Sequence, residues 1–154
     1  MQILETNAYA KINLALCITG RRSDGYHQLD MLMQSIDLHD TLTFTAQSGL
    51  TLEVATDAAA GINTAGIPVG ADNLILRAAE RMQKAFHHKH TQEPLPGAHI
   101  RLVKRIPMAA GLAGGSADAA ATLLALNELW QAGLGTLTLC RIGAELGADI
   151  PYCL

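Results

Sequence analysis

Alternating apolar and polar positions dominate the first third of the chain. From position 11 to position 18 every second side chain is a large aliphatic one, which is the period of a β-strand with one apolar face. Lys11 and Asn13 alternate with these aliphatic residues and therefore share the opposite face. The pattern predicts paired strands near 3–19, another strand near 30–38, and alternating strands near 41–46 and 50–55.

The second half of the chain changes to a helical period. Apolar residues recur three or four positions apart, which predicts helices near 73–88, 115–132 and 136–146. Their apolar faces hold Ile75, Ala78, Met82 and Phe86, then Ala119, Leu123, Leu126 and Trp130, then Leu139, Ile142 and Leu146. A strand near 98–104 separates the first two helices. Strands first and helices mixed in later indicate an α+β domain.

A glycine-rich segment, Pro107–Ala121, joins the last predicted strand to the second helix. Gly111, Gly114 and Gly115 allow the backbone to bend sharply and let an anion approach it closely. The first turn of the following helix offers unpaired N–H groups and the positive end of the helix dipole. The segment therefore predicts a phosphate site, with a ligand-free glycine turn as the alternative.

Ser116 is the expected N-cap of the helix that follows the glycines. This would place Asp118 in the first turn, where its charge complements the helix dipole but repels a phosphate brought too close. We therefore expect a bound phosphate to lie toward the glycines.

The loop matches neither common nucleotide pattern, G-x-x-x-x-G-K-[ST] or G-x-G-x-x-G. Its order, P-x-x-x-G-L-x-G-G-S-x-x-A, instead resembles the ATP loop of the GHMP kinase superfamily. Further segments resemble, within that superfamily, the kinases of 4-diphosphocytidyl-2-C-methyl-D-erythritol. These segments are AYAKINL at 8–14, GRRSDGYH at 20–27, DNLILRA at 72–78 and GADIP at 147–151. The resemblance runs from about residue 8 to the end and implies an N-terminal GHMP domain, a mixed sheet packed against helices.

The resemblance implies that Lys11 and Asp149 are the catalytic residues. Phosphoryl transfer needs mainly alignment of the nucleophile and stabilisation of charge. Asp149 would accept the proton of the substrate hydroxyl, and Lys11 would screen the developing negative charge. By residue type alone, Lys11 would be a solvated lysine and Asp149 a turn residue beside a helix end.

The same resemblance implies that ATP, accompanied by Mg²⁺, binds to the loop and to Asn73 and Lys104. The loop contacts would come from Pro107, Ala109, Ala110, Gly111, Leu112, Ala113, Gly114, Gly115, Ser116 and Ala117. Helix capping explains Asn73 equally well.

Two positions of the loop differ from the residues that the relatives carry. Ala113 stands where glycine is common and is tolerated if its φ stays negative, and Ala117 replaces a common second serine.

Asn13, Tyr26 and His27 would bind the substrate, a cytidine diphosphate-linked methylerythritol. A tyrosine ring offers a stacking face to a pyrimidine, and an imidazole offers one donor and one acceptor to its edge. The alternative is a simple turn, because Ser23-Asp24-Gly25 is typical turn chemistry. We expect no function for His87, His88 and His90, whose spacing and setting suit a solvated loop.

The composition narrows the class of protein. A length of 154 residues with 49% hydrophobic residues is enough for one domain with a core. The net charge of -3 argues against nucleic-acid binding. No apolar run is long enough for a membrane helix, and no basic segment precedes an apolar run at the N-terminus. Three cysteines without close spacing fit a reduced, cytoplasmic setting.

The chain ends at Leu154, five residues after Asp149, whereas GHMP kinases continue into a second α/β domain. We therefore expect a truncated protein of one domain, 1–154, that lacks the C-terminal GHMP domain and exposes the apolar surface facing it. The leading hypothesis is ATP-dependent phosphorylation of the 2-hydroxyl of the cytidyl substrate in non-mevalonate isoprenoid synthesis. The alternatives are another GHMP small-molecule kinase and an inactive nucleotide-binding fragment.

Overall fold

The computed structural model describes residues 2–21, 23, 25 and 27–154. Its elements are β1 (Ile3–Arg21), β2 (His27–Gln47), β3 (Leu50–Thr56), α1 (Leu74–Lys89), β4 (Gly97–Lys104), α2 (Gly114–Leu129), α3 (Thr136–Leu146) and α4 (Ile150–Cys153). The α+β fold predicted from the sequence is confirmed. The three predicted helices and the strand before the glycine-rich loop are also confirmed, with small shifts at their ends.

The four strands form one mixed sheet in the order β1-β2-β4-β3. β2 runs antiparallel to both β1 and β4, and β3 runs parallel to β4. The separate strands expected near 30–38 and 41–46 are wrong, because they form the single strand β2. Its first half pairs with β1, and from Thr41 onward it pairs with β4 as well. The boundary predicted between 38 and 41 is therefore the point where β2 gains a second partner strand, and the strand itself does not break there.

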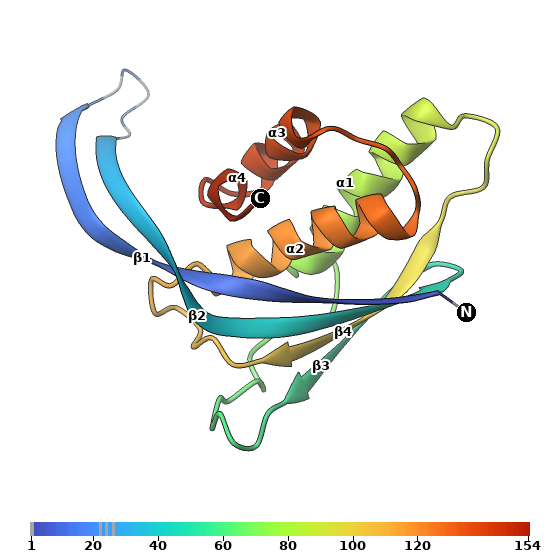
Figure 1. Cartoon of the computed structure of the whole chain (residues 1–154), viewed down its shortest axis with the longest axis horizontal. Helices are drawn as coiled ribbons and strands as arrows, with labels where there is room; N and C mark the ends of the chain where they lie inside the picture. Colours follow the sequence, from blue (N-terminus) through green and yellow to red (C-terminus); the bar gives the residue numbers. More distant parts are fainter. Residues whose placement is uncertain (1, 22, 24, 26) are drawn as a thin grey trace.

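The core lies between the sheet and helices α1 and α2, which cover one face of it (Figure 1). Its fully buried side chains include Leu42, Phe44, Ile100 and Leu102 from the strands and Ile75, Met82, Leu123 and Leu126 from the helices. Alternate strand residues and one stripe of α1 meet in this layer, whereas α2 is buried on nearly every side because the sheet and the other three helices surround it. α2 packs mainly against β1 and β2 of the sheet, and the glycine-rich loop connects the end of β4 to its start.

β1 and β2 continue beyond the helices as a curved two-stranded arm (Figure 1). The predicted alternation in β1 is present, but its aliphatic residues face solvent on the arm instead of a core. The exposed apolar residues of the arm are Leu14, Leu16, Ile18, Leu29 and Leu32, each at least 45% exposed. No element among the described residues covers them. An apolar surface of this kind is typical of an interaction site.

The three cysteines are free thiols, with Cys17 exposed and Cys140 and Cys153 half-buried. Burial, with a further contribution from Asp149, raises the pKa of Cys153 to about 11. Within the described part of the chain, no helix has both the length and the apolar character to cross a membrane.

Candidate active site

The glycine-rich loop enters α2 through residues with left-handed backbone. Ala109, Gly111 and Ala113 have φ values of 55°, 75° and 57°. Ala113 is the N-cap of α2, and no side chain caps the helix. The expectation that Ser116 is the N-cap is therefore wrong. The left-handed turn at Ala113 starts the helix at Gly114, so Ser116 falls within the first turn.

The early start of α2 also changes the position of Asp118. Asp118 lies in the second turn rather than the first, and it is buried. Its side chain therefore does not complement the N-terminus of the helix as the sequence suggested. The N–H groups of Gly114, Gly115 and Ser116 precede the first intrahelical bond, which Ala117 makes to the carbonyl of Ala113 at 2.8 Å. Unpaired N–H groups at the start of a helix are the kind of donors that bind anions.

Ala113 does not meet the condition of a negative φ, so we predict that Ala113→Gly stabilises the chain. Left-handed backbone costs a residue with a Cβ about 1–2 kcal/mol, and glycine avoids most of that cost. We expect a gain of about 1 kcal/mol in the free energy of unfolding in urea. Ala117→Gly, inside the same helix, is the control and should lose about 1 kcal/mol. Equal losses in both variants would contradict the assignment.

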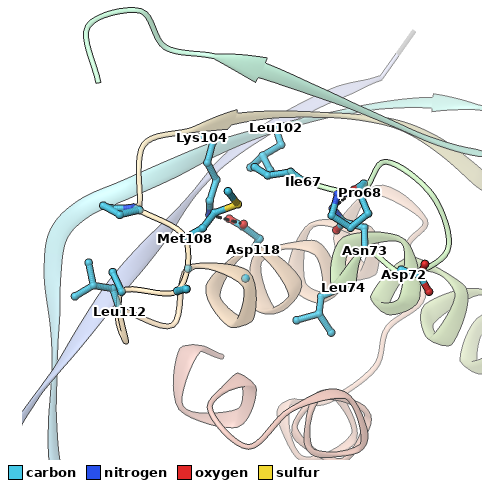
Figure 2. Close-up of a pocket in the computed structure, with 15 residues that line it drawn as sticks. Ile67, Pro68, Asp72, Asn73, Leu74, Leu102, Lys104, Met108, Leu112 and Asp118 are labelled. Carbon is cyan, nitrogen blue, oxygen red and sulfur yellow. Dashed lines mark hydrogen bonds and ion pairs between the residues drawn. The ribbon is translucent and has the colours of Figure 1, made fainter. Parts of the chain in front are cut away.

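A cavity opens between the loop, the start of α1 and the start of α2 (Figure 2). Of the residues expected to bind ATP, eight line it. These are Asn73, Lys104, Pro107, Ala109, Ala110, Leu112, Gly114 and Gly115. Gly111, Ala113, Ser116 and Ala117 do not line the cavity. The sequence did not predict the apolar wall, which includes Ile67, Leu74, Leu102 and Met108.

Asn73 stabilises the start of α1 at the edge of this cavity. Its Oδ1 accepts a hydrogen bond from the N–H of Ile75 at 2.9 Å, which makes it the N-cap of α1. Its Nδ2 donates to the carbonyl of Pro68 at 2.7 Å. The capping interpretation of Asn73 is therefore confirmed. The same bonds hold the segment before α1 against the cavity.

A buried charge cluster lies behind the loop. The Lys104 ammonium donates to Asp118 at 2.9 Å and also to Asp40. The other oxygen of Asp40 accepts from the N–H groups of Arg105 and Ile106, the first two residues after β4. All three charged side chains are at most 5% exposed. Asp40 was missed in the sequence, because a single aspartate in a polar stretch gives no sign of burial.

The protonation of this cluster follows from its burial. Burial alone would lower the pKa of Lys104, but the neighbouring Asp118 and Asp40 outweigh it and raise that pKa. Burial raises the pKa of Asp118 to about 8, with the Lys104 charge opposing the rise and Asp40 adding to it. The cluster therefore favours a charged Lys104 and a protonated Asp118.

Gly114 is required because Lys104 passes directly beneath the start of α2. A Cβ on Gly114 would lie 2.9 Å from Cγ2 of Ile106 and 3.0 Å from the Lys104 ammonium. A Cβ on Gly115 would meet nothing closer than 3.6 Å. Only the first position is therefore too crowded for a larger residue.

We predict opposite effects of alanine at these two neighbouring glycines. Gly114→Ala should lower the free energy of unfolding by about 1–3 kcal/mol, because Ile106 and the ion-paired Lys104 must both move. Gly115→Ala is the matched control and should gain up to about 1 kcal/mol from helix propensity. Urea unfolding of both variants gives the comparison. A stabilising Gly114→Ala would show that the space behind the helix is larger than described.

Lys11 and Asp149 meet on the other side of the loop. Lys11 lies at a register shift in β1, and its N–H donates to the carbonyl of Leu112 at 3.1 Å. Its ammonium lies 3.2 Å from Oδ1 of Asn13 and 3.6 Å from Oδ2 of Asp149. The Lys11 side chain is 6% exposed, whereas that of Asp149 is 35% exposed. A buried cation thus holds a carboxylate that a ligand can reach.

Ser116 lies toward this pair. Its hydroxyl is 3.9 Å from the point where a Cβ on Gly147 would stand, two residues before Asp149. Asp149 begins α4 without using its side chain to cap the helix, so the carboxylate stays free for other contacts. The first turn of α2 therefore separates the cavity on one side from the Lys11–Asp149 pair on the other.

The structure does not bring His27 to this pair. His27 pairs with Arg21 at the end of the arm, ten residues along β1 from Lys11, which is about 30 Å of extended strand. Tyr26 lies outside the described residues. Asn13 is exposed and contacts Lys11. Of the three residues expected to bind substrate, Asn13 alone is described beside Lys11.

Part of the chain matches a known protein family. Residues 73–154, just over half of the chain, match the family described as GHMP kinases N terminal domain. A 4-diphosphocytidyl-2-C-methyl-D-erythritol kinase of Moorella thermoacetica is 48% identical over 157 residues, with 100% of this chain and 49% of the relative covered. The kinase of the same name from Pelotomaculum thermopropionicum is 46% identical and is also covered to 49%. The chain thus spans about half the length of these curated relatives.

Solved structures agree on the fold. A crystal structure of 4-(cytidine 5'-diphospho)-2C-methyl-D-erythritol kinase superposes with a TM-score of 0.74 at 37% identity, covering 97% of this chain and 48% of that one. A homoserine kinase from Cytophaga hutchinsonii gives a TM-score of 0.61 at 17% identity, covering 97% of this chain and 42% of that one, which shows a shared fold alone. The chain belongs to the GHMP kinases, and its fold is that of their N-terminal domain.

Proposed function

We propose that the chain supplies the ATP loop and the catalytic pair of a kinase that phosphorylates the 2-hydroxyl of 4-diphosphocytidyl-2-C-methyl-D-erythritol, a precursor in non-mevalonate isoprenoid synthesis. The observation that carries the proposal is the contact between Lys11 and Asp149 beside the glycine-rich loop. Relatives at 46–48% identity carry the name of that kinase. Names and geometry thus point to the same chemistry.

ATP would bind on both sides of the start of α2. The cavity of about 240 Å³ lies just below the usual size of small-molecule sites, roughly 300–1,000 Å³, so it suits one part of a nucleotide. Its apolar wall would take the base. The phosphates would lie against the N–H groups of Gly114, Gly115 and Ser116, where the helix dipole favours negative charge. The terminal phosphate would then point toward Lys11.

Asp149 and Lys11 would act on the substrate hydroxyl. Asp149 would take the hydroxyl proton while the oxygen forms its bond to the γ-phosphorus and ADP leaves with the electrons of the broken P–O bond. The Lys11 ammonium would stabilise the negative charge on the transferring group. Its burial strengthens this effect, because water screens the charge less.

Mg²⁺ would accompany the nucleotide. The loop offers N–H donors, which bind phosphate oxygens and do not bind metal ions. The ion would therefore take most of its ligands from the phosphates and from water, as is common for Mg²⁺.

Asn13 would contact the substrate near the transferred phosphate, and Tyr26 with His27 would contact the cytosine. His27 lies at the end of the arm, so this assignment requires the arm to bend toward Lys11 when the substrate binds. We further propose that residues 1–154 are the N-terminal domain and that a C-terminal GHMP domain packs beside it. The exposed apolar residues of the arm support that second part of the proposal.

The test is release of ADP from ATP and Mg²⁺ in the presence of 4-diphosphocytidyl-2-C-methyl-D-erythritol, beside homoserine, mevalonate and galactose. We expect turnover with the cytidyl substrate alone. Turnover with a different alcohol would favour another GHMP kinase. If ATP binds but no alcohol is phosphorylated, even with the second half of a relative supplied, the chain is a nucleotide-binding domain and the proposed reaction is wrong.

A further inference from the structure

The buried cluster of Asp40, Lys104 and Asp118 has a feature that the proposed reaction does not use. Oδ1 of Asp118 is buried and has no hydrogen-bond partner among the described residues. Oδ2 of the same carboxyl accepts from Lys104. A buried polar atom without a partner is rare and calls for a physical reason. An ionised carboxylate would leave this oxygen negatively charged and unsolvated, which is costly.

The cluster lies where it can affect a bound phosphate. Asp118 is in the second turn of α2, one turn beyond the N–H groups expected to bind phosphate, and it lines the same cavity (Figure 2). The Lys104 ammonium is directly beneath Gly114. With both aspartates ionised the cluster carries a net charge of -1, and with one proton on Asp118 it is neutral. A negative cluster would repel the phosphates that the helix dipole attracts.

We propose that Asp118 is a positioning residue that couples nucleotide binding to one proton. It holds that proton when phosphate lies on the loop, and loss of the proton to solvent leaves a negative charge behind the loop that weakens binding. This inference rests on the proposed function in one respect only, namely that the loop binds the phosphates of ATP. It does not depend on the identity of the phosphate acceptor.

Few other charged groups face Asp118. Lys104 at the end of β4 and Asp40 in β2 are the two that act on its pKa. Lys11 in β1 and Asp149 before α4 are paired with each other. Cys153 in α4 is close enough for Asp118 to contribute to its raised pKa, but that thiol stays protonated up to about pH 11. Among the described residues of α1 and α3, no charged group contributes to the pKa of Asp118.

The direction of the pH effect follows from the raised pKa of Asp118. Because that pKa is about 8 in the folded chain, the proton is present at pH 7.5 and mostly lost at pH 9. We expect the dissociation constant of ATP to rise about fivefold to tenfold between these two values. ATP bound at pH 9 should take up close to one proton from solvent. Calorimetric titrations in two buffers of different ionisation enthalpy measure both quantities.

Asp118→Asn gives a neutral side chain of nearly the same shape at every pH. The variant should bind ATP with a dissociation constant that hardly changes from pH 7.5 to pH 9 and should take up no proton. Glu128→Gln is the matched control, because it removes an exposed carboxylate from the far end of the same helix. It should keep the pH dependence of the unchanged chain.

A second measurement needs no nucleotide. The folded chain keeps the Asp118 proton up to about pH 8, whereas the unfolded chain loses it near pH 3.8. The stability contributed by this group is therefore present below pH 3.8 and is lost as the pH rises toward 8. The Tm of the unchanged chain should fall relative to that of Asp118→Asn across this range.

The outcomes separate the two proposals. If ATP does not bind at pH 7.5, both the proposed function and this inference fail. If ATP binds and its dissociation constant changes equally with pH in the unchanged chain and in Asp118→Asn, this inference fails and the proposed function stands. Loss of the pH dependence and of proton uptake in Asp118→Asn alone supports the inference.

Discussion

Asp149→Asn is expected to lower turnover of the cytidyl substrate at least about a hundredfold, the lower end of what a general base contributes. The amide keeps the shape of the side chain but cannot accept the hydroxyl proton. The contact with Lys11 shows that the carboxylate is held in place while remaining 35% exposed. Steady-state release of ADP measures the effect. Binding of ATP should change little, because Asp149 does not line the cavity proposed for the base and makes no contact with the N–H groups proposed for the phosphates.

Glu145→Gln is the matched control for this prediction. Glu145 is a carboxylate four residues earlier, exposed and paired with Arg81 on the surface. Its loss should leave turnover within about twofold, since exposed ion pairs contribute little. Equal urea midpoints in both variants would exclude unfolding as the cause of lost activity. Near-normal turnover of Asp149→Asn would overturn its role as the base.

Lys104→Met should have the largest effect on stability, a loss of about 3–5 kcal/mol in the free energy of unfolding. Removing one partner of a buried ion pair leaves the other without compensation, and such losses are typically of this size. Here Asp40 is fully buried and anchors the N–H groups of Arg105 and Ile106, so the start of the loop would lose its support as well. Urea unfolding at pH 7 measures the change.

Lys84→Met provides the comparison, because Lys84 is an exposed lysine on α1. Its replacement by the same residue should change the free energy of unfolding by no more than about 0.5 kcal/mol. A similarly small loss for Lys104→Met would mean that Asp40 needs no compensating charge in its buried position. The charge cluster would then have no part in holding the loop.

The sequence was sufficient to locate three helices and the strand that leads into the glycine-rich loop. The period of apolar residues located α1, α2 and α3 and the strand β4, because large apolar side chains recur at a regular spacing in each of them. The resemblance to GHMP kinases placed Lys11 and Asp149 in one site although 138 positions separate them, and the structure brings them to 3.6 Å. Periodicity alone could not have joined them, since it carries no information on contacts between distant segments.

Tertiary structure decided the features that depend on long-range pairing and burial. Taking Ser116 as the N-cap misplaced Asp118 in the first turn, whereas α2 begins after the left-handed turn at Ala113 and Asp118 contacts Lys104 from the second turn. Nothing in the sequence marked Asp40 as buried, and only the pairing of β2 with β4 places it beside Lys104 at the end of β4. The apolar face of the arm was visible in the sequence, but its exposure to solvent was not. A pattern of apolar residues predicts which side chains share a face. Only the packing of other segments determines whether that face is covered.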